Sequence, residues 1–192
     1  MTRIIAGLAK GHRLDVPAAG TRPTSDRVRE SIFSSVEHAV GGFDGRSVLD
    51  LYAGSGACGL EAMSRGARRA VLVESATKAV GVIRSNIART GLDAEVVKAD
   101  VTRWVAGPAT AQFDVVFADP PYSLSSKLVS NVVSSLSVGG WLADGAVVVV
   151  ERDSHDDEIE WATGFSDITR RRFGNTSVLR AVWYVANGSE GD

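Results

Sequence analysis

Short runs of apolar, often β-branched residues alternate along the chain with longer stretches of mixed polarity. The apolar runs predict buried strands at 47–53, 69–74, 95–99, 113–119 and 146–150. The stretches between them predict helices at about 56–65, 77–90 and 126–136. Helices that alternate with continuously apolar strands are typical of a parallel sheet covered on both faces.

Both ends of the chain depart from this alternation. Residues 167–173 and 177–185 have the pattern of two strands joined by a turn, so an antiparallel hairpin should complete a seven-stranded, mostly parallel α/β sheet. Residues 1–45 contain several glycines and prolines before a helix expected at about 25–40, with Ser25 or Thr24 as N-cap. We predict an N-terminal extension at 1–45, one main domain at 46–187 and a tail at 188–192.

The composition is that of a soluble globular protein, with 192 residues of which 44% are hydrophobic and 23% charged. No apolar run approaches the ~18 residues that a membrane helix needs. The first seven residues are too short for a signal peptide, and Lys10 and Arg13 follow soon after. We therefore expect a cytoplasmic protein without a membrane partner. The single cysteine, Cys58, excludes an internal disulfide and should pack as a small apolar residue.

Charge is distributed unevenly, although the net charge is only −2. Residues 1–29 hold six bases and two acids, and residues 168–180 hold four arginines and no acid. Residues 151–160 hold six acids and one base. A nearly neutral protein of this kind can still present a basic face to nucleic acid. Strand alternation should send the neighbouring arginines at 170–172 to opposite faces, so only some of them can touch one ligand.

A glycine-rich turn follows the first predicted strand and opens a helix, in the pattern G-x-G-x-x-G from Gly54 to Gly59. Glycines allow a sharp turn and a close approach of the backbone to a ligand, and the helix start offers free N–H groups. Glu74 ends the next strand, where a carboxylate can accept hydrogen bonds from ribose hydroxyls. This pattern fits an NAD-dependent dehydrogenase and an S-adenosylmethionine-dependent enzyme equally well.

Asp50 helps to separate these two interpretations. It lies inside the strand before the glycine turn, where it would meet the positively charged amino-acid end of S-adenosylmethionine, directly or through water, and would repel a pyrophosphate. Asp50 therefore favours S-adenosylmethionine. Asp100, after the third strand, would meet the adenine amino group or serve as a helix N-cap.

The tetrapeptide Asp119-Pro120-Pro121-Tyr122 ends the fourth strand, at the sheet edge where doubly wound folds bind ligands. Its prolines stiffen the loop and remove two N–H donors, which leaves carbonyl oxygens as acceptors. An exocyclic base amine is a poor nucleophile. If the Asp119 carboxylate and the Pro120 carbonyl accept the two hydrogens of the amine, its nitrogen lone pair points at a methyl donor. Tyr122 would stack on the base. The motif predicts methyl transfer to a planar amine without a metal.

The tetrapeptide and the glycine turn resemble those of class I methyltransferases with a [DN]-P-P-[YFW] motif, which act on amino groups of adenine, guanine, cytosine or glutamine. More narrowly, the stretch from Arg3 to Phe33 resembles the RsmD family, bacterial enzymes that make N2-methylguanine in 16S ribosomal RNA. Matches at 48–56, 59–62 and 64–67 extend the resemblance over nearly the whole chain. The departures are mild: Tyr52 where phenylalanine is common, and Cys58 where leucine is commoner.

This resemblance implies a Rossmann-like methyltransferase fold, S-adenosylmethionine as cofactor and 16S rRNA of the small ribosomal subunit as substrate, with ribosomal proteins as possible further partners of a monomer. The expected cofactor contacts are Asp50, Tyr52, Ala53, Gly54, Ser55, Gly56, Glu74, Ser75, Asp100, Val101 and Asp119. The expected RNA contacts are Arg3, Lys10, Arg13, Arg22, Thr24, Arg27 and Arg29. Residues 21–24 resemble a lid over the cofactor. Arg22, Arg27 and Arg29 would either contact RNA or organise the site. A DNA adenine-N6 methyltransferase and a non-catalytic RNA-binding assembly factor remain as alternatives.

Overall fold

A computed structural model describes residues 2–18 and 26–185 as an α/β fold. The strands are β1 (Thr2–Arg3), β2 (Arg13–Leu14), β3 (Ser47–Leu51), β4 (Arg69–Glu74), β5 (Glu95–Lys98), β6 (Phe113–Ala118), β7 (Leu142–Asp153), β8 (Phe165–Phe173) and β9 (Thr176–Trp183). The helices are α1 (Asp26–Val40), α2 (Ala57–Ser64), α3 (Thr77–Thr90), α4 (Val101–Val105) and α5 (Ser126–Val138). The predicted alternation of strands and helices is confirmed.

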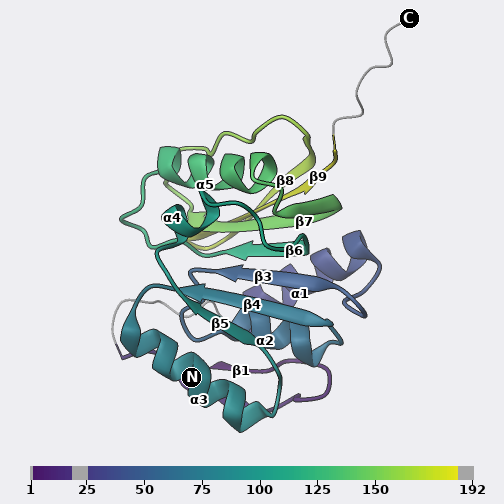
Figure 1. The fold of residues 1–192 in the computed structure, drawn as a ribbon, viewed down its shortest axis with the longest axis vertical. Helices are drawn as coiled ribbons and strands as arrows, with labels where there is room; N and C mark the ends of the chain where they lie inside the picture. Colours follow the sequence, from purple (N-terminus) through teal and green to yellow (C-terminus); the bar gives the residue numbers. More distant parts are fainter. Residues whose placement is uncertain (1, 19–25, 186–192) are drawn as a thin grey trace, which may run out of the picture.

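The central sheet has seven strands in the order β5-β4-β3-β6-β7-β9-β8 (Figure 1). Strands β5, β4, β3, β6 and β7 pair in parallel. Strand β9 pairs antiparallel with both β7 and β8. The C-terminal hairpin therefore completes the sheet as the sequence predicts.

Helices cover both faces of this sheet because alternate strand residues point to opposite sides. Val48 of β3 packs into the core under α1 and α2, whereas Leu49 and Leu51 pack into the core under α4 and α5. All five residues of β3 are buried, as expected for a central parallel strand. The two cores hold the sheet rigid beneath the edge where its parallel strands end.

Helix α1 is part of this main core. Phe33 of α1 stacks on Phe117 of β6 with ring centroids 5.1 Å apart, and Val36 is fully buried beside them. The short β1–β2 pair and its loop form a smaller cluster, in which Ile4 packs with Leu60 of α2. The predicted boundary at residue 45 thus divides the chain in sequence, while α1 shares the core of the sheet.

Three features differ from the sequence-based expectation. The fifth predicted strand, 146–150, is part of the longer strand β7, which pairs with β9 as far as Asp153. Asp144 and Gly145 interrupt the apolar pattern and hid its first part, where Phe113 pairs with Leu142 before a register shift. Helix α4 and the β1–β2 pair are too short to produce a periodic signal.

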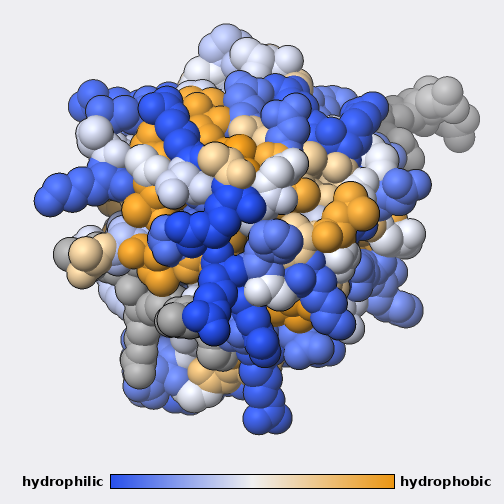
Figure 2. Space-filling model, turned by 90° about the horizontal axis from the view of Figure 1, so that it is seen from below, coloured by the Kyte–Doolittle hydropathy of each residue, from blue (hydrophilic) through white to orange (hydrophobic). Residues whose placement is uncertain are grey.

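Seen from below the view of Figure 1, the molecule presents mostly hydrophilic side chains with several apolar patches between them (Figure 2). Within the described ranges 2–18 and 26–185, no helix is long and apolar enough to cross a membrane. Cys58 packs, partly buried, against the core under α1 and α2, which confirms the packing role predicted for it.

Candidate functional site

The glycine turn, Glu74 and the tetrapeptide meet at the carboxyl edge of the sheet. Leu51 is in register with Val73 of β4 and with Ala118 of β6, so the three strands end level with one another. The Asp119 N–H donates to the Leu51 carbonyl over 3.4 Å. Segments that lie far apart in sequence thus form one site, where doubly wound folds bind their ligands.

The glycine turn is sharp, and its glycines have two different roles. Tyr52, Gly54 and Gly56 have φ values of 58°, 56° and 77°, in the left-handed region where glycine is favoured. A Cβ on Gly56 would lie 2.8 Å from a Leu72 methyl group, and a Cβ on Gly59 would also lie 2.8 Å from the Leu72 side chain. The last two glycines of the motif therefore allow α2 to pack closely on β4.

Glu74 holds the glycine turn in place. One carboxylate oxygen accepts a hydrogen bond from the Gly54 N–H at 2.9 Å, and the other accepts from the Ala76 N–H at 2.8 Å. A carboxylate has about four lone-pair sites, so both oxygens keep capacity for ligand hydroxyls. The sequence analysis identified the residue but missed this bracing role.

Asp50 lies beneath the turn and is only 4% exposed. Its carboxylate accepts a hydrogen bond from the Gly59 N–H at 2.8 Å. Burial and the nearby Glu74 raise the pKa of Asp50 to about 7, and the Gly59 hydrogen bond opposes that rise. Asp50 is therefore poised to ionise near neutral pH, a property that favours a cationic ligand.

Asp119 belongs to the same group of acids. Part of the residue faces solvent, yet the protein surrounds its carboxyl group, and this desolvation raises the pKa of Asp119 well above its usual range. Glu151 and Asp50 raise it further, and Arg152 lowers it. A positive charge bound among these carboxyl groups would favour their ionised forms.

The tetrapeptide presents its acceptors as the sequence suggests. Pro120 is buried, while Pro121 and Tyr122 are exposed, Tyr122 by 55%. The Pro121 carbonyl accepts from the Leu124 N–H at 2.9 Å. No described residue donates a hydrogen bond to the Pro120 carbonyl. The Pro120 oxygen thus stays available to a ligand as a backbone acceptor.

Asp100 is the N-cap of α4, because its carboxylate accepts from the Arg103 N–H at 3.0 Å. This confirms the capping role that the sequence left as one of two possibilities. Among the other residues of the proposed cofactor site, Val101 is buried, Ser75 is exposed and Tyr52 is partly buried. Burial raises the pKa of the Tyr52 hydroxyl.

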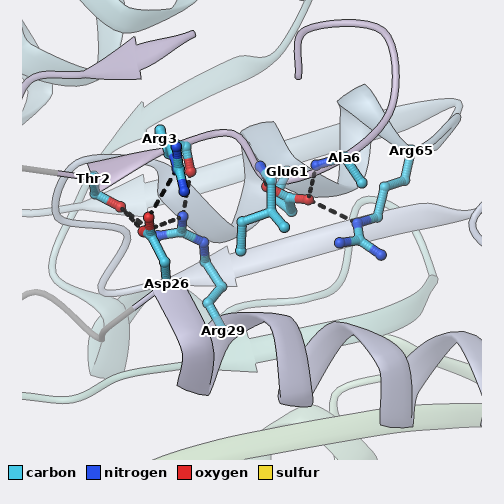
Figure 3. A network of polar contacts seen from close by, with 8 residues as sticks. Thr2, Arg3, Ala6, Asp26, Arg29, Glu61 and Arg65 are labelled. Carbon is cyan, nitrogen blue, oxygen red and sulfur yellow. Dashed lines mark hydrogen bonds and ion pairs between the residues drawn. The ribbon is translucent and has the colours of Figure 1, made fainter. Parts of the chain in front are cut away.

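The prediction that Arg29 contacts RNA is wrong, because its side chain is only 2% exposed and serves the protein interior. Its guanidinium donates to the Thr2 hydroxyl and to the Arg3 carbonyl, and it forms an ion pair with Asp26 at 3.1 Å (Figure 3). Arg29 therefore anchors β1 to α1, the organising role that the sequence analysis gave as its alternative.

Glu61 is a second anchor, which the sequence analysis missed. It is fully buried on α2, and its carboxylate accepts from the N–H groups of Ile5 at 2.7 Å and Ala6 at 3.0 Å and from Arg65 at 2.8 Å (Figure 3). The available signal was an acid between apolar helix residues, Leu60 and Ala62. A buried carboxylate in that position requires several donors.

Asn86, also missed, joins the glycine turn to the N-terminal segment. It is fully buried on α3, and its amide donates to the Ser55 carbonyl at 2.9 Å and the Asp15 carbonyl at 3.0 Å. Its oxygen accepts from the Asp15 N–H at 2.9 Å. The same side chain thus fixes part of the proposed cofactor site and the strand exit at residue 15.

The other predicted RNA contacts are cations on the surface. Arg3 and Lys10 line one hollow beside α1, where Arg3 pairs with Asp26 at 3.2 Å. Arg13 and Arg27 are exposed elsewhere on this segment. Arg22 and Thr24 lie outside the described residues, as does the proposed lid at 21–24. Within the described residues, no group of three or more His, Cys, Asp or Glu side chains is placed to hold a metal ion.

This sheet topology, with the glycine turn and Asp-Pro-Pro-Tyr at the carboxyl ends of its strands, defines a class I, Rossmann-like methyltransferase fold. A family model described as Conserved hypothetical protein 95 matches residues 2–182. This match, together with the relative that follows, shows that the chain belongs to the RsmD family. Ribosomal RNA small subunit methyltransferase D from Escherichia coli K12 is 38% identical over 154 residues, which cover 79% of this chain and 74% of that protein. The predicted family and fold are both confirmed.

Two further comparisons cover nearly the whole chain. The Putative rRNA methyltransferase YlbH from Bacillus subtilis is 34% identical over 184 residues, with 92% of this chain and 96% of that protein covered. The solved structure of the putative methyltransferase yhhF from Escherichia coli is similar with a TM-score of 0.83 and 31% identity. That match covers 96% of this chain and 98% of the other.

Proposed function

We propose that this protein transfers a methyl group from S-adenosylmethionine to the exocyclic N2 of a guanine in 16S rRNA of the small ribosomal subunit. The observation that carries the proposal is the acceptor-rich Asp119–Tyr122 loop beside the glycine turn at one sheet edge. The names of the relatives support ribosomal RNA as the substrate. The guanine N2 specificity rests on the resemblance of the Arg3–Phe33 stretch to the RsmD family.

The residues at this edge fit the proposed cofactor. S-adenosylmethionine, when bound, supplies an electrophilic methyl group on a positively charged sulfur, and it also carries a cationic amino group. Asp50 and Asp119 have raised pKa values that a bound cation would lower, because it favours the ionised carboxylates. Glu74 keeps acceptor capacity for ribose hydroxyls beside the turn that it braces. The eleven contacts expected from the sequence, from Asp50 to Asp119, remain our proposed cofactor site.

The protein would act on the target amine by positioning it. The Asp119 carboxylate and the Pro120 carbonyl accept its two N–H hydrogens and hold its nitrogen lone pair toward the methyl group. The exposed Tyr122 ring offers a face on which the base stacks. The Pro121 carbonyl is a less suitable acceptor, since it already accepts a hydrogen bond from the Leu124 N–H.

The cations of the N-terminal segment would bind RNA phosphates, which position the substrate without reading its sequence. Arg3, Lys10, Arg13 and Arg27 are exposed for this role. Arg22 and Thr24 remain proposed RNA contacts. We also propose that the enzyme is a monomer, that ribosomal proteins are additional partners, and that the chain divides at residues 45 and 187.

Methyl transfer from tritiated S-adenosylmethionine tests the proposal, with three substrates compared: small subunits from cells lacking the gene, naked 16S rRNA and duplex DNA. We expect label in the rRNA, recovered as N2-methylguanine after digestion to nucleosides. Asp119→Ala should reduce the rate at least a hundredfold, as losses of positioned polar groups do. The surface variant Asp157→Ala should keep the wild-type rate.

Other outcomes would refute the proposal. Label found only in DNA would indicate a DNA methyltransferase. A wild-type rate for Asp119→Ala would remove the proposed chemistry. No transfer to any subunit preparation would favour a role in ribosome assembly without catalysis.

A further inference from the structure

A hollow lies between α1 and the β8–β9 hairpin, outside the site described above. It is shallow, with about 20 Å³ of space accessible to a water-sized molecule, and it opens to solvent. Its walls include two hydroxyl residues of α1, Ser31 and Ser35, and four hairpin residues, Thr169, Arg171, Phe173 and Arg180. We call it the hairpin groove.

The register of the hairpin determines which arginines face this groove. Thr169 is opposite Arg180, and Arg171 is opposite Val178, after a bulge between Ser166 and Thr169. Opposed residues share a face of the sheet, and neighbours alternate, so these side chains lie on the α1 face. Only two of the four hairpin arginines therefore reach the groove.

The other two arginines lie on the opposite face and have partners there. Arg170 forms an ion pair with Glu158 at 3.5 Å and donates to the Ser177 hydroxyl. Arg172 donates to the Gly174 carbonyl at 3.1 Å. Their positive charge is thus directed away from the groove.

The groove arginines lack such partners. Neither Arg171 nor Arg180 forms an ion pair with any residue in 2–18 or 26–185, and the Arg180 Nε is buried without a hydrogen-bond partner. Glu151 lies in the same row of the sheet as Arg171, with Val178 between them, and the two form no ion pair. Arg171 is exposed and so stays solvated, whereas the buried Nε of Arg180 lacks an acceptor, which is unfavourable unless an anion binds this guanidinium.

The chemistry of the groove and its rim fits a phosphate that is attached to a sugar. The planar fork of arginine binds phosphate with two parallel hydrogen bonds. Phe173 and Val178 provide apolar wall beside the arginines, and the α1 serines add hydroxyl groups. A free anion would need no such apolar wall.

The groove also lies at the catalytic edge of the sheet. Ala118 is in register with Val150 of β7, and the next β7 residue, Glu151, is in register with Val178, which is opposite Arg171. Arg171 is thus level with Asp119, three strand spacings away, or about 14 Å at about 4.8 Å each. A single RNA strand spans that distance in a few nucleotides.

We propose that the hairpin groove binds a backbone phosphate of the RNA strand that carries the target base, through Arg171 and Arg180. This inference rests on the proposed function, because it assumes RNA at the Asp119 loop. The groove would hold the strand at a second point and so orient the base at Tyr122.

The test compares Arg171→Gln and Arg180→Gln with Arg172→Gln, a matched control on the other face of the hairpin. Each groove variant should raise KM for small subunits about tenfold at an unchanged kcat. The salt dependence of binding to a labelled single-stranded 16S rRNA fragment should weaken by about 0.7 in slope per arginine lost. Arg172→Gln should change neither value, and Arg171→Lys should keep the salt slope because it keeps the charge, but should lose part of the affinity because lysine lacks the planar fork.

An unchanged KM and salt slope in both groove variants, with folding confirmed by circular dichroism, would overturn the groove proposal alone. An equal loss in Arg172→Gln would overturn it too, since the effect would then come from net charge. If the wild-type protein methylates no RNA, the proposed function fails instead, and the salt slope of RNA binding still decides whether the groove binds phosphate.

Discussion

Two buried carboxyl groups, Asp50 and Glu61, lie only eleven positions apart, but their surroundings prepare them for opposite roles. Glu61 receives two backbone N–H groups and the Arg65 guanidinium, so its negative charge is compensated within the protein. Asp50 receives one N–H group, and burial raises its pKa to about 7. Glu61 is therefore structural, whereas Asp50 is placed to respond to a ligand.

The raised pKa of Asp50 predicts that cofactor binding depends on pH. Below pH 7 the free protein holds Asp50 protonated, and a cationic ligand requires the ionised form. The affinity for S-adenosylmethionine should therefore fall about tenfold between pH 8 and pH 6. Titration calorimetry measures this change. In Asp50→Asn the decline should become smaller, because Asp119 is then the only one of these two carboxyl groups left to titrate; an identical decline in both proteins would assign it elsewhere.

Glu61 should contribute strongly to stability. Glu61→Ala leaves two backbone N–H groups without their acceptor, and it leaves the side chain of Arg65, which is 10% exposed, with Glu37 as its remaining ion-pair partner. We expect a loss of about 3–5 kcal/mol in the free energy of unfolding, measured in urea. Glu158→Ala, which removes an acid that is 87% exposed, should leave the urea midpoint unchanged. Equal midpoints for the two variants would contradict the anchoring role.

Among the elements, α2 and α3 connect the N-terminal segment to the site. Ser64 of α2 accepts from the Ala9 N–H at 2.9 Å and donates to the Ala6 carbonyl. Asn86 of α3 binds Asp15 in that segment and also the Ser55 carbonyl in the glycine turn. Only the α3 connection reaches the proposed cofactor site directly.

This difference separates the effects of two variants. Asn86→Ala removes the donor to Ser55, which should loosen the glycine turn and weaken S-adenosylmethionine binding about tenfold, because a preorganised site binds more tightly. Ser64→Ala loosens the same N-terminal segment but should leave that affinity unchanged. Calorimetry on both variants, beside their unfolding curves, measures affinity and stability separately. A parallel loss of affinity in Ser64→Ala would show that the segment, and not the turn, is what matters.

At the scale of the whole molecule, the parallel strands bring acids to one edge, and the basic residues surround it. At that edge Glu151 and Asp50 raise the pKa of Asp119, whereas Arg171 and Arg180 lie beside it in the hairpin groove. Although the net charge is only −2, the protein combines an acidic site that suits a cationic cofactor with basic residues nearby that suit RNA.

Such a site should couple ligand binding to the stability of the entire fold. At a hundred times its Kd, S-adenosylmethionine should raise the free energy of unfolding by about 2.7 kcal/mol. For a chain of this size that is a rise in Tm of roughly 5–10 °C, measured by thermal unfolding. NAD at the same concentration should leave Tm unchanged. A shift with NAD alone would restore the dehydrogenase interpretation of the glycine turn.

Much of the fold and of the central site could be predicted because their signals are local. Each predicted strand of the central sheet has a corresponding strand in the structure, and the glycine turn and the tetrapeptide each lie within a few consecutive residues. The β1–β2 pair and α4 escaped prediction because elements of two to five residues have no periodicity to detect. The start of β7 escaped because Asp144 and Gly145 interrupt its apolar pattern.

The sequence by itself determined the class of fold, the family and the residues at the centre of the site, since strand, turn and motif patterns depend on neighbouring residues. Only the tertiary structure decided the roles of side chains whose partners lie far along the chain. Arg29 proved to be buried against β1, Glu61 binds residues about 55 positions away, and Asn86 reaches Ser55. Burial and hydrogen bonding at that range depend on how the helices pack on the sheet, which no local pattern records.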